Sequence, residues 1–316
     1  MKKKPLLPLS AAAEQLLPAP DESMKCSVFT TSLGVNPAGT AISAVWVVVV
    51  DTPLTWPKPV FRHEHLRGLD STGLDGVGRP VRVLASNPRT GHELSAFAYR
   101  RSPEGTVAAR LSLAGRSAAQ AVAALTAGDD PRMTPSAHEL EPRAILVCTQ
   151  GSHDVCCGAE GSRLAKKVEN DPRLGDVPVF RVSHTGGHRF APTAMTFPDG
   201  RMWAYADVDL LAAAMNRTGT PADLADRCRG SWEAPDPRTM AAEVAAWAQG
   251  DWNSAPSNFA ELDDDVIRVS RGSAHHDVRV TVARDIPSIR CRAAGGLPAK
   301  PGVEFAAEVV GNSHPG

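Results

Sequence analysis

Short apolar runs and amphipathic stretches alternate along the chain in an order that predicts an α/β protein. The run A-V-W-V-V-V-V-D-T-P, residues 44–53, is β-branched and ends at a proline, which is typical of a buried strand. A helix is expected around 60–69. The pattern then predicts strands at 79–87, 93–101 and 105–115, and a helix at 117–128 that begins at an N-capping serine and ends at a glycine.

The same order of elements returns after residue 142. Strand patterns occupy 143–151 and 177–184, with a helical pattern at 157–171 between them. Two strands joined at a Pro-Asp-Gly turn follow at 191–209, and a helix follows these. Both halves are therefore predicted to have the element order β-α-β-β-β-α, although their amino-acid sequences do not repeat. A crossover helix followed by an antiparallel pair fits a thioredoxin-like layer of sheet and helices, so we predict two such units in tandem, at 25–130 and 143–215.

The remaining segments have simpler patterns. Residues 1–24, rich in Pro and Ala, predict a flexible leader; residues 216–255 predict a helical segment; and residues 256–316 predict a small β-rich C-terminal region. The N-terminal lysines imitate a signal peptide, but prolines and Glu14 interrupt the apolar stretch behind them. The longest apolar run, residues 41–50, is about half of what a bilayer crossing needs. We therefore expect a cytoplasmic protein with no membrane partner and without structural disulfides.

The charge balance excludes one large class of partner. The 316 residues carry a formal net charge of -1. This gives no electrostatic argument for binding nucleic acid or an anionic membrane surface. The chemistry must therefore be sought in particular side chains.

Cysteines and histidines gather in two short segments, V-C-T-Q-G-S-H-D-V-C-C-G and S-H-T-G-G-H-R-F. Cys148 is expected at the end of a strand, Cys157 at the start of the following helix, and His184 and His188 just after the next strand. Loops at the C-terminal edge of a sheet are where α/β proteins place their sites, so these side chains are expected to converge. Gly186 and Gly187, between the histidines, exclude the helical His pair of metalloproteases and favour a tight loop.

The residues alone leave three chemistries open. Two cysteines and two histidines form a zinc-binding set as well as an iron–sulfur one. Cys156 and Cys157 are a candidate redox-active thiol pair, although the chain has no C-x-x-C motif. Cysteine is also among the most buried residue types, so the thiols are otherwise simple packing residues.

The two segments resemble the sucrase/ferredoxin-like family, whose members are thioredoxin-like [2Fe-2S] ferredoxins. The resemblance implies that Cys148, Cys157, His184 and His188 bind a [2Fe-2S] cluster, with zinc as the alternative metal. It implies an electron carrier with an unknown redox partner protein, rather than an enzyme with its own substrate. The alternatives are a zinc-stabilised binding module without a redox role and a thiol oxidoreductase that uses Cys156 and Cys157. The sequence departs from the family after the histidines, where R-F-A-P-T replaces the more usual R-F-A-G-N.

Other residues of the two segments are candidates for a supporting shell around the cluster. They are His153, Asp154, Cys156, Gly158, Gly186, Gly187 and Arg189. Because consecutive side chains diverge, Cys156 is expected to pack rather than to ligate beside Cys157. His153 and Asp154 either orient ligands or form a solvated pair, and Arg189 either adjusts the local charge or is exposed. Cys26, Cys228 and Cys291 look isolated and inert, and the half at 25–130 is expected to bind no cluster.

Overall fold

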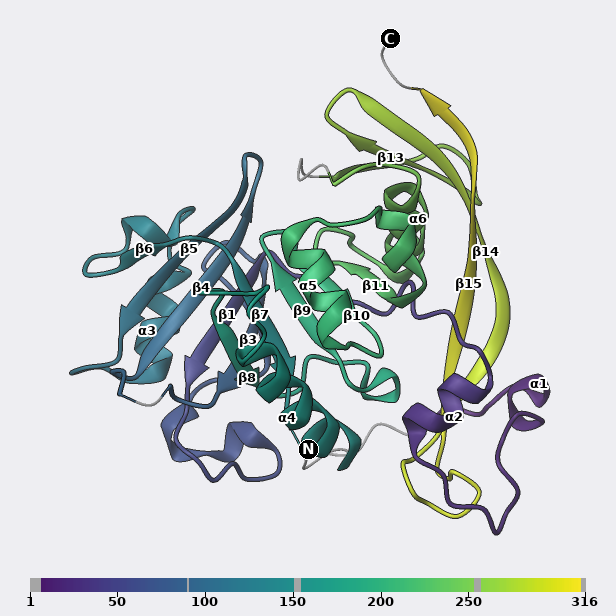
Figure 1. Ribbon diagram of the computed structural model, residues 1–316, viewed down its shortest axis with the longest axis horizontal. Helices are drawn as coiled ribbons and strands as arrows, with labels where there is room; N and C mark the ends of the chain where they lie inside the picture. Colours follow the sequence, from purple (N-terminus) through teal and green to yellow (C-terminus); the bar gives the residue numbers. More distant parts are fainter. Residues whose placement is uncertain (1–6, 90, 151–154, 253–256, 314–316) are drawn as a thin grey trace.

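Within the residues that the structure describes, the strands form two sheets, one of eleven strands and one of four (Figure 1). The computed structural model describes residues 7–89, 91–150, 155–252 and 257–313. The large sheet contains parallel and antiparallel pairs and carries helices, so the predicted α/β class is confirmed. The assignment of each half to the thioredoxin fold stays a prediction.

The two halves of the large sheet have the same strand order and the same strand directions. In the first half, β1 pairs in parallel with β3 and antiparallel with β4, which pairs with β5; the strands are β1 Trp46–Asp51, β3 Pro80–Ser86, β4 Ser95–Ser102 and β5 Gly105–Ser112. In the second half, β7 pairs in parallel with β8 and antiparallel with β9, which pairs with β10; the strands are β7 Ala144–Cys148, β8 Val179–Val182, β9 Ala194–Phe197 and β10 Arg201–Trp203. The halves join edge to edge where Ser86 of β3 meets Val182 of β8.

Three short strands complete this sheet. They are β2 Thr72–Leu74 beside β3, β6 His138–Leu140 beside β5, and β11 Cys228–Ser231 beside β10. The last of these is a correction to the sequence prediction, because residues 216–255 are not wholly helical. This segment contains η5 Pro221–Arg227, then β11, then α6 Pro237–Ala248.

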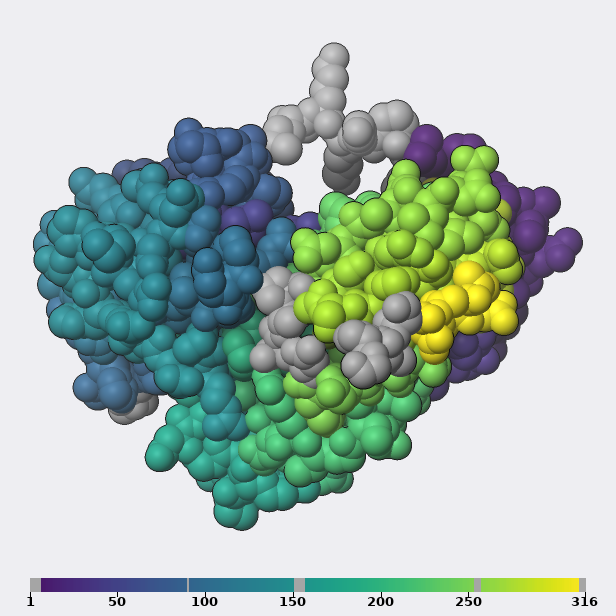
Figure 2. Space-filling model, turned by 90° about the horizontal axis from the view of Figure 1, so that it is seen from above, coloured from purple at the N-terminus to yellow at the C-terminus, as the bar shows by residue number. Residues whose placement is uncertain are grey.

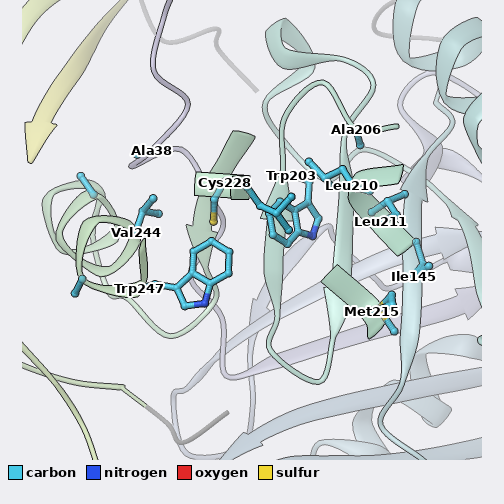
Figure 3. Close-up of a cluster of buried hydrophobic side chains, with 14 of the residues drawn as sticks. Ala38, Ile145, Trp203, Ala206, Leu210, Leu211, Met215, Cys228, Val244 and Trp247 are labelled. Carbon is cyan, nitrogen blue, oxygen red and sulfur yellow. The ribbon is translucent and has the colours of Figure 1, made fainter. Parts of the chain in front are cut away.

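Helices cover one face of each half. In the second half, α4 Val155–Glu169, α5 Val208–Asn216 and α6 pack on alternate residues of the strands, such as Ile145 and Trp203 (Figure 3). In the first half, α3 Ala118–Leu125 covers β4 and β5, and Ser117 forms its capping box with Gln120, as an N-capping serine predicts. The helix expected at 60–69 is instead two short 3₁₀ turns, η1 Val60–Arg62 and η2 Glu64–Leu66. Another 3₁₀ turn, η3 Pro131–Met133, precedes β6.

The opposite faces of the two halves pack against each other. Val47 and Val49 of β1 share one apolar cluster with Leu146 of β7. Tyr99 of β4 stacks on Phe197 of β9 with a distance of 4.2 Å between ring centroids, although four strands separate β4 from β9 in the sheet. The sheet is therefore folded over onto itself, and a third core lies between its halves.

The C-terminal region is an antiparallel sheet of four strands, which the sequence predicts as β-rich. Its strands are β12 Ser257–Glu261, β13 Val266–Arg271, β14 Ala274–Ser288 and β15 Lys300–Ser313. One part of it packs on α6 through Ile267 and Val278. The far end of the long β14–β15 pair reaches the N-terminal helices α1 Ala11–Glu14 and α2 Cys26–Ser32 (Figure 1). Seen from above, N-terminal residues lie along the edge of the C-terminal sheet (Figure 2).

The N-terminal segment packs on the loop that joins β14 to β15. Residues 7–24, for which the sequence predicts a flexible leader, include α1 and an isolated β-bridge between Ser23 and Ala294. Leu9, Leu17 and Met24 pack with Ile289 and Ala299. No helix in the described part of the chain is long and apolar enough to cross a membrane.

Candidate functional site

The parallel pair β7–β8 brings the first cysteine and the first histidine to the same edge of the sheet. Cys148 is the last residue of β7, lies opposite Val182 of β8, and is fully buried. His184 follows two residues after Val182, and its backbone N–H donates to the side-chain oxygen of Gln150 at 2.8 Å. Cys148 and His184 therefore lie at the C-terminal edge of the sheet, where the strand pattern predicts them.

Helix α4 brings the second cysteine against the first. Cys157 lies near the start of α4 with an exposed fraction of 1% and packs with Cys148 and Ala191. Gly161, one turn later, lies so close to β7 that a Cβ there would overlap the carbonyl oxygen of Cys148. The missing side chain at Gly161 therefore allows the two thiols to meet.

A glycine loop carries the two histidines. Gly186 and Gly187 have φ angles of 79° and 65°, in the left-handed region that side chains rarely adopt, and the short turn η4 His188–Phe190 follows. The ring centroids of His184 and His188 lie 5.9 Å apart, and both side chains are half-buried. The prediction of a tight loop between the histidines is confirmed.

Two arginines, Arg82, which is half-buried, and Arg229, which is buried, hold this loop through hydrogen bonds. Arg82 of β3 donates to the carbonyl oxygen of His184 at 2.6 Å, and Arg229 of β11 donates to the carbonyl oxygen of Gly186 at 3.3 Å. A Cβ on Gly187 would overlap the guanidinium of Arg229. Burial lowers the pKa of Arg82, and it lowers the pKa of Arg229 to about 10. Neither arginine has an ion pair with Asp or Glu among the described residues.

The hydrogen bonds around Cys148 favour its thiolate. Hydrogen bonds from the side chains of Cys157 and His184, and from the backbone N–H groups of Gln150 and Thr185, outweigh burial and hold the pKa of Cys148 well below its ordinary value. Arg82 and Arg229 add positive charge on the same side. The pocket therefore suits an anionic sulfur atom, which is the form that binds metals.

Two cysteines that look isolated in the sequence lie beside this site, which corrects the prediction that they are isolated. Cys26, at the start of α2, is fully buried, and its Sγ lies 3.3 Å from Nδ1 of His188, 162 residues away. Cys291, in the loop between β14 and β15, packs against the cluster of Cys148, Cys157 and Ala191. The N-terminal and C-terminal segments thus form a cover over the site. The third of these cysteines, Cys228, is buried beside Arg201.

The structure describes some of the residues that the sequence suggests as a supporting shell around the cluster. His153, Asp154 and the side chain of Cys156 lie outside the described residues. Gly158 lies in α4 directly after Cys157. Arg189 is half-buried and extends along the ring of Phe190, 4.9 Å from the ring centroid, on the side of Cys26 and Tyr205.

The donor set suits a soft metal centre, but the donors do not surround one point. Thiolate sulfur and imidazole nitrogen are the ligands of zinc, copper and iron–sulfur centres. Among the described residues, no three His, Cys, Asp or Glu side chains are grouped as ligands of a single metal ion. The contacts instead form a chain, in which Cys148 contacts Cys157 and His184, and His184 lies beside His188.

Comparison with known families identifies the family of this chain. A family model described as sucrase/ferredoxin-like matches residues 38–224. The chain belongs to the sucrase/ferredoxin-like family. The match contains Cys148, Cys157, His184 and His188, and it excludes both segments of the cover, with Cys26 and Cys291. No curated protein and no solved structure matches the chain significantly.

Proposed function

We propose that this family member binds a [2Fe-2S] cluster through Cys148, Cys157, His184 and His188 and transfers single electrons to or from a redox partner protein. The observation that carries the proposal is the convergence of a buried thiol pair and a histidine pair beside two arginines that have no carboxylate partner among the described residues. When bound, such a cluster supplies a one-electron redox centre. The chain itself binds it, sets its electrostatic surroundings and limits the access of water.

The arginines argue for an anionic group at this position. A buried charge without an opposite charge is costly, typically by several kcal/mol. Arg82 and Arg229 have no carboxylate partner among the described residues, whereas the sulfur atoms of Cys148 and Cys157 lie within their electrostatic reach. Thiolates that ligate a metal would balance these cations. The two positive charges would also favour the reduced state, which carries one more electron.

The spread of the four donors, with no three of them grouped among the described residues, favours a two-iron cluster over zinc. A structural zinc ion needs four donors at about 2.0–2.3 Å around one point. A [2Fe-2S] cluster with mixed ligation takes two cysteines on one iron and two histidines on the other. Cys148 with Cys157 and His184 with His188 fit that division. Neutral imidazoles in place of two thiolates predict a midpoint potential above that of all-cysteine ferredoxins, in the range of about -150 to +300 mV seen for comparable centres.

Anaerobic purification and metal analysis test the proposal. We expect a red-brown protein with about two iron atoms and two labile sulfides per chain, visible charge-transfer bands, and an EPR signal on reduction. A colourless protein with one tightly bound zinc would instead establish the zinc-stabilised module. A colourless, metal-free protein whose redox activity is lost on alkylation of Cys156 or Cys157 would establish the thiol oxidoreductase.

A further inference from the structure

A cavity lies between the two halves of the folded sheet. It is at the opposite ends of β7 and β8 from Cys148 and His184. Arg143, just before β7, and the loop 172–178, just before β8, form one side of it. Residues of β4 and β5 form the other side. Its volume is about 640 Å³, within the range of small-molecule sites, which is about 300–1,000 Å³.

Aromatic rings form one wall of this cavity. Phe97 of β4 and Phe180 of β8 meet edge to face, with 4.8 Å between ring centroids. The guanidinium of Arg89 lies 5.3 Å from the centroid of each ring. Tyr99 extends the same wall. Because these rings are only 2% exposed, their role is to hold the guanidinium of Arg89 in a defined orientation. Half-buried apolar side chains of the lining, such as Leu140 and Val177, offer contact to a flat ligand group.

Of the four arginines that line the cavity, Arg89, Arg110 and Arg143 make no ion pair with described residues. The Nε atoms of Arg89 and Arg110 are both buried and have no hydrogen-bond partner in this part of the structure. A buried donor without an acceptor costs about 1–3 kcal/mol, so both groups would gain from an acceptor supplied by a ligand.

The other charged groups do not supply that acceptor. Arg173 is paired with Asp171 and Asp209. Arg143 donates to the carbonyl oxygen of Met215 and to the side chain of Asn216. The acids that line the cavity are Glu141 and Asp176, and Asp51 faces Arg89 and Arg110 from β1 without an ion pair to either. Positive charge therefore exceeds negative charge around the cavity.

We propose that this cavity binds a small anionic molecule with a planar ring, whose phosphate, carboxylate or sulfonate group is held by Arg89 and Arg110 while its ring packs on Leu140 and Val177. Guanidinium groups bind such oxyanions through parallel hydrogen bonds, which gives both affinity and orientation. The site is independent of any metal at Cys148. It remains whether or not the proposed cluster is present.

A pair of fluorescent probes that differ in charge tests this site in the full-length protein. Anilinonaphthalene sulfonate carries a planar ring system and an anionic group, and N-phenylnaphthylamine offers a similar ring system without the charge. We expect one binding site that prefers the sulfonate, and at least tenfold weaker sulfonate binding in the Arg89→Gln/Arg110→Gln double variant, with binding of the neutral probe changed less than twofold. Arg132→Gln is the matched control, because Arg132 is an exposed arginine paired with Asp130 and Glu139 outside the cavity.

Two further measurements keep the result interpretable. The Arg89→Lys variant retains the charge and should bind the sulfonate with intermediate affinity, even if the double variant folds poorly. Inorganic phosphate and adenosine monophosphate should displace the sulfonate, and adenosine should not. Equal binding of the charged and neutral probes, or unchanged sulfonate binding in a folded double variant, would overturn the proposal and leave only an apolar cavity.

Discussion

The Cα of Gly161 lies directly against the carbonyl oxygen of Cys148, so closely that even a methyl group on Gly161 would overlap it. This contact fixes how near α4 comes to β7, and so how near the thiol of Cys157 comes to the thiol of Cys148. A residue with no functional group of its own thus determines the geometry of the site.

Replacing Gly161 with alanine should therefore separate the thiols. We expect Gly161→Ala to lower the free energy of unfolding by about 1–3 kcal/mol, as overpacking does, and to lower metal content in the same protein. Urea unfolding and metal analysis measure the two effects. Gly128→Ala is the control, because nothing lies within 4 Å of a Cβ there and its φ is not in the left-handed region. Wild-type metal content in Gly161→Ala would show that the distance between α4 and β7 does not limit binding.

The two neighbouring cysteines should behave differently. Cys157 is buried against Cys148, and consecutive side chains of a helix point in different directions. Cys148→Ser and Cys157→Ser should each lose the cluster, whereas Cys156→Ser should keep it. Iron content per chain in the three variants measures this. Retention of iron in Cys157→Ser together with its loss in Cys156→Ser would show that Cys156, and not Cys157, is the ligand.

The local hydrophobic pattern predicted that Cys148 and His184 converge, because their positions depend only on neighbouring strands and the helix between them. A buried run ending at Cys148, a helix after it and a second run ending before His184 make one parallel crossover unit, and such a unit places its loops at one edge. The pattern gave no signal for Cys26 and Cys291. Each lies in a segment without a motif, and only the packing of α2 and of the loop between β14 and β15 brings them to the site.

The sequence patterns also gave no sign of the arginines beside the site or of the packing of the two halves of the sheet against each other. Arg82 alternates with apolar residues in β3 and looks like a solvent-facing strand residue, yet the loop of His184 covers it. Tyr99 and Phe197 belong to different halves, and their stacking depends on the curvature of the whole sheet. Periodicity identifies which face of a strand is apolar, but not which distant face will cover it.

The buried carboxyl of Asp51 gives a stability prediction that is independent of the metal site. Burial raises its pKa from 3.8 to about 6, outweighing the N–H of Ser95 and the charges of Arg89 and Arg110. Because the folded state holds the proton more tightly, its stability falls as pH rises from about 4 to 6. Above that range the ionised carboxylate costs about 3 kcal/mol. Asp51→Asn should therefore stabilise the protein at pH 7.5 by up to this amount and have little effect at pH 4.

Asp75 is a matched control with the opposite sign. Burial acts to raise its pKa, but hydrogen bonds from Arg79 and Trp46 outweigh burial and lower the pKa to about 2. Its ionised form therefore stabilises the fold above about pH 4, and Asp75→Asn should destabilise the protein at pH 7.5. Urea unfolding of both variants at the two pH values measures the difference. An Asp51→Asn variant that is less stable than wild type at pH 7.5 would contradict the assigned sign.

The histidine pair provides the most direct test of the proposed ligand set. A cysteine at position 184 or 188 would replace a neutral imidazole with a thiolate, and the added negative charge disfavours the reduced state. We expect His184→Cys and His188→Cys each to keep a cluster and to lower its midpoint potential, and about 59 mV corresponds to a tenfold change in the equilibrium constant of a one-electron couple. His138→Cys is the control, because His138 is an exposed residue of β6 in the other half of the sheet. If the histidines only shape the glycine loop above Arg82 and Arg229, the potentials of both variants will equal that of the wild type while cluster content stays intact, and the two imidazoles are then not ligands.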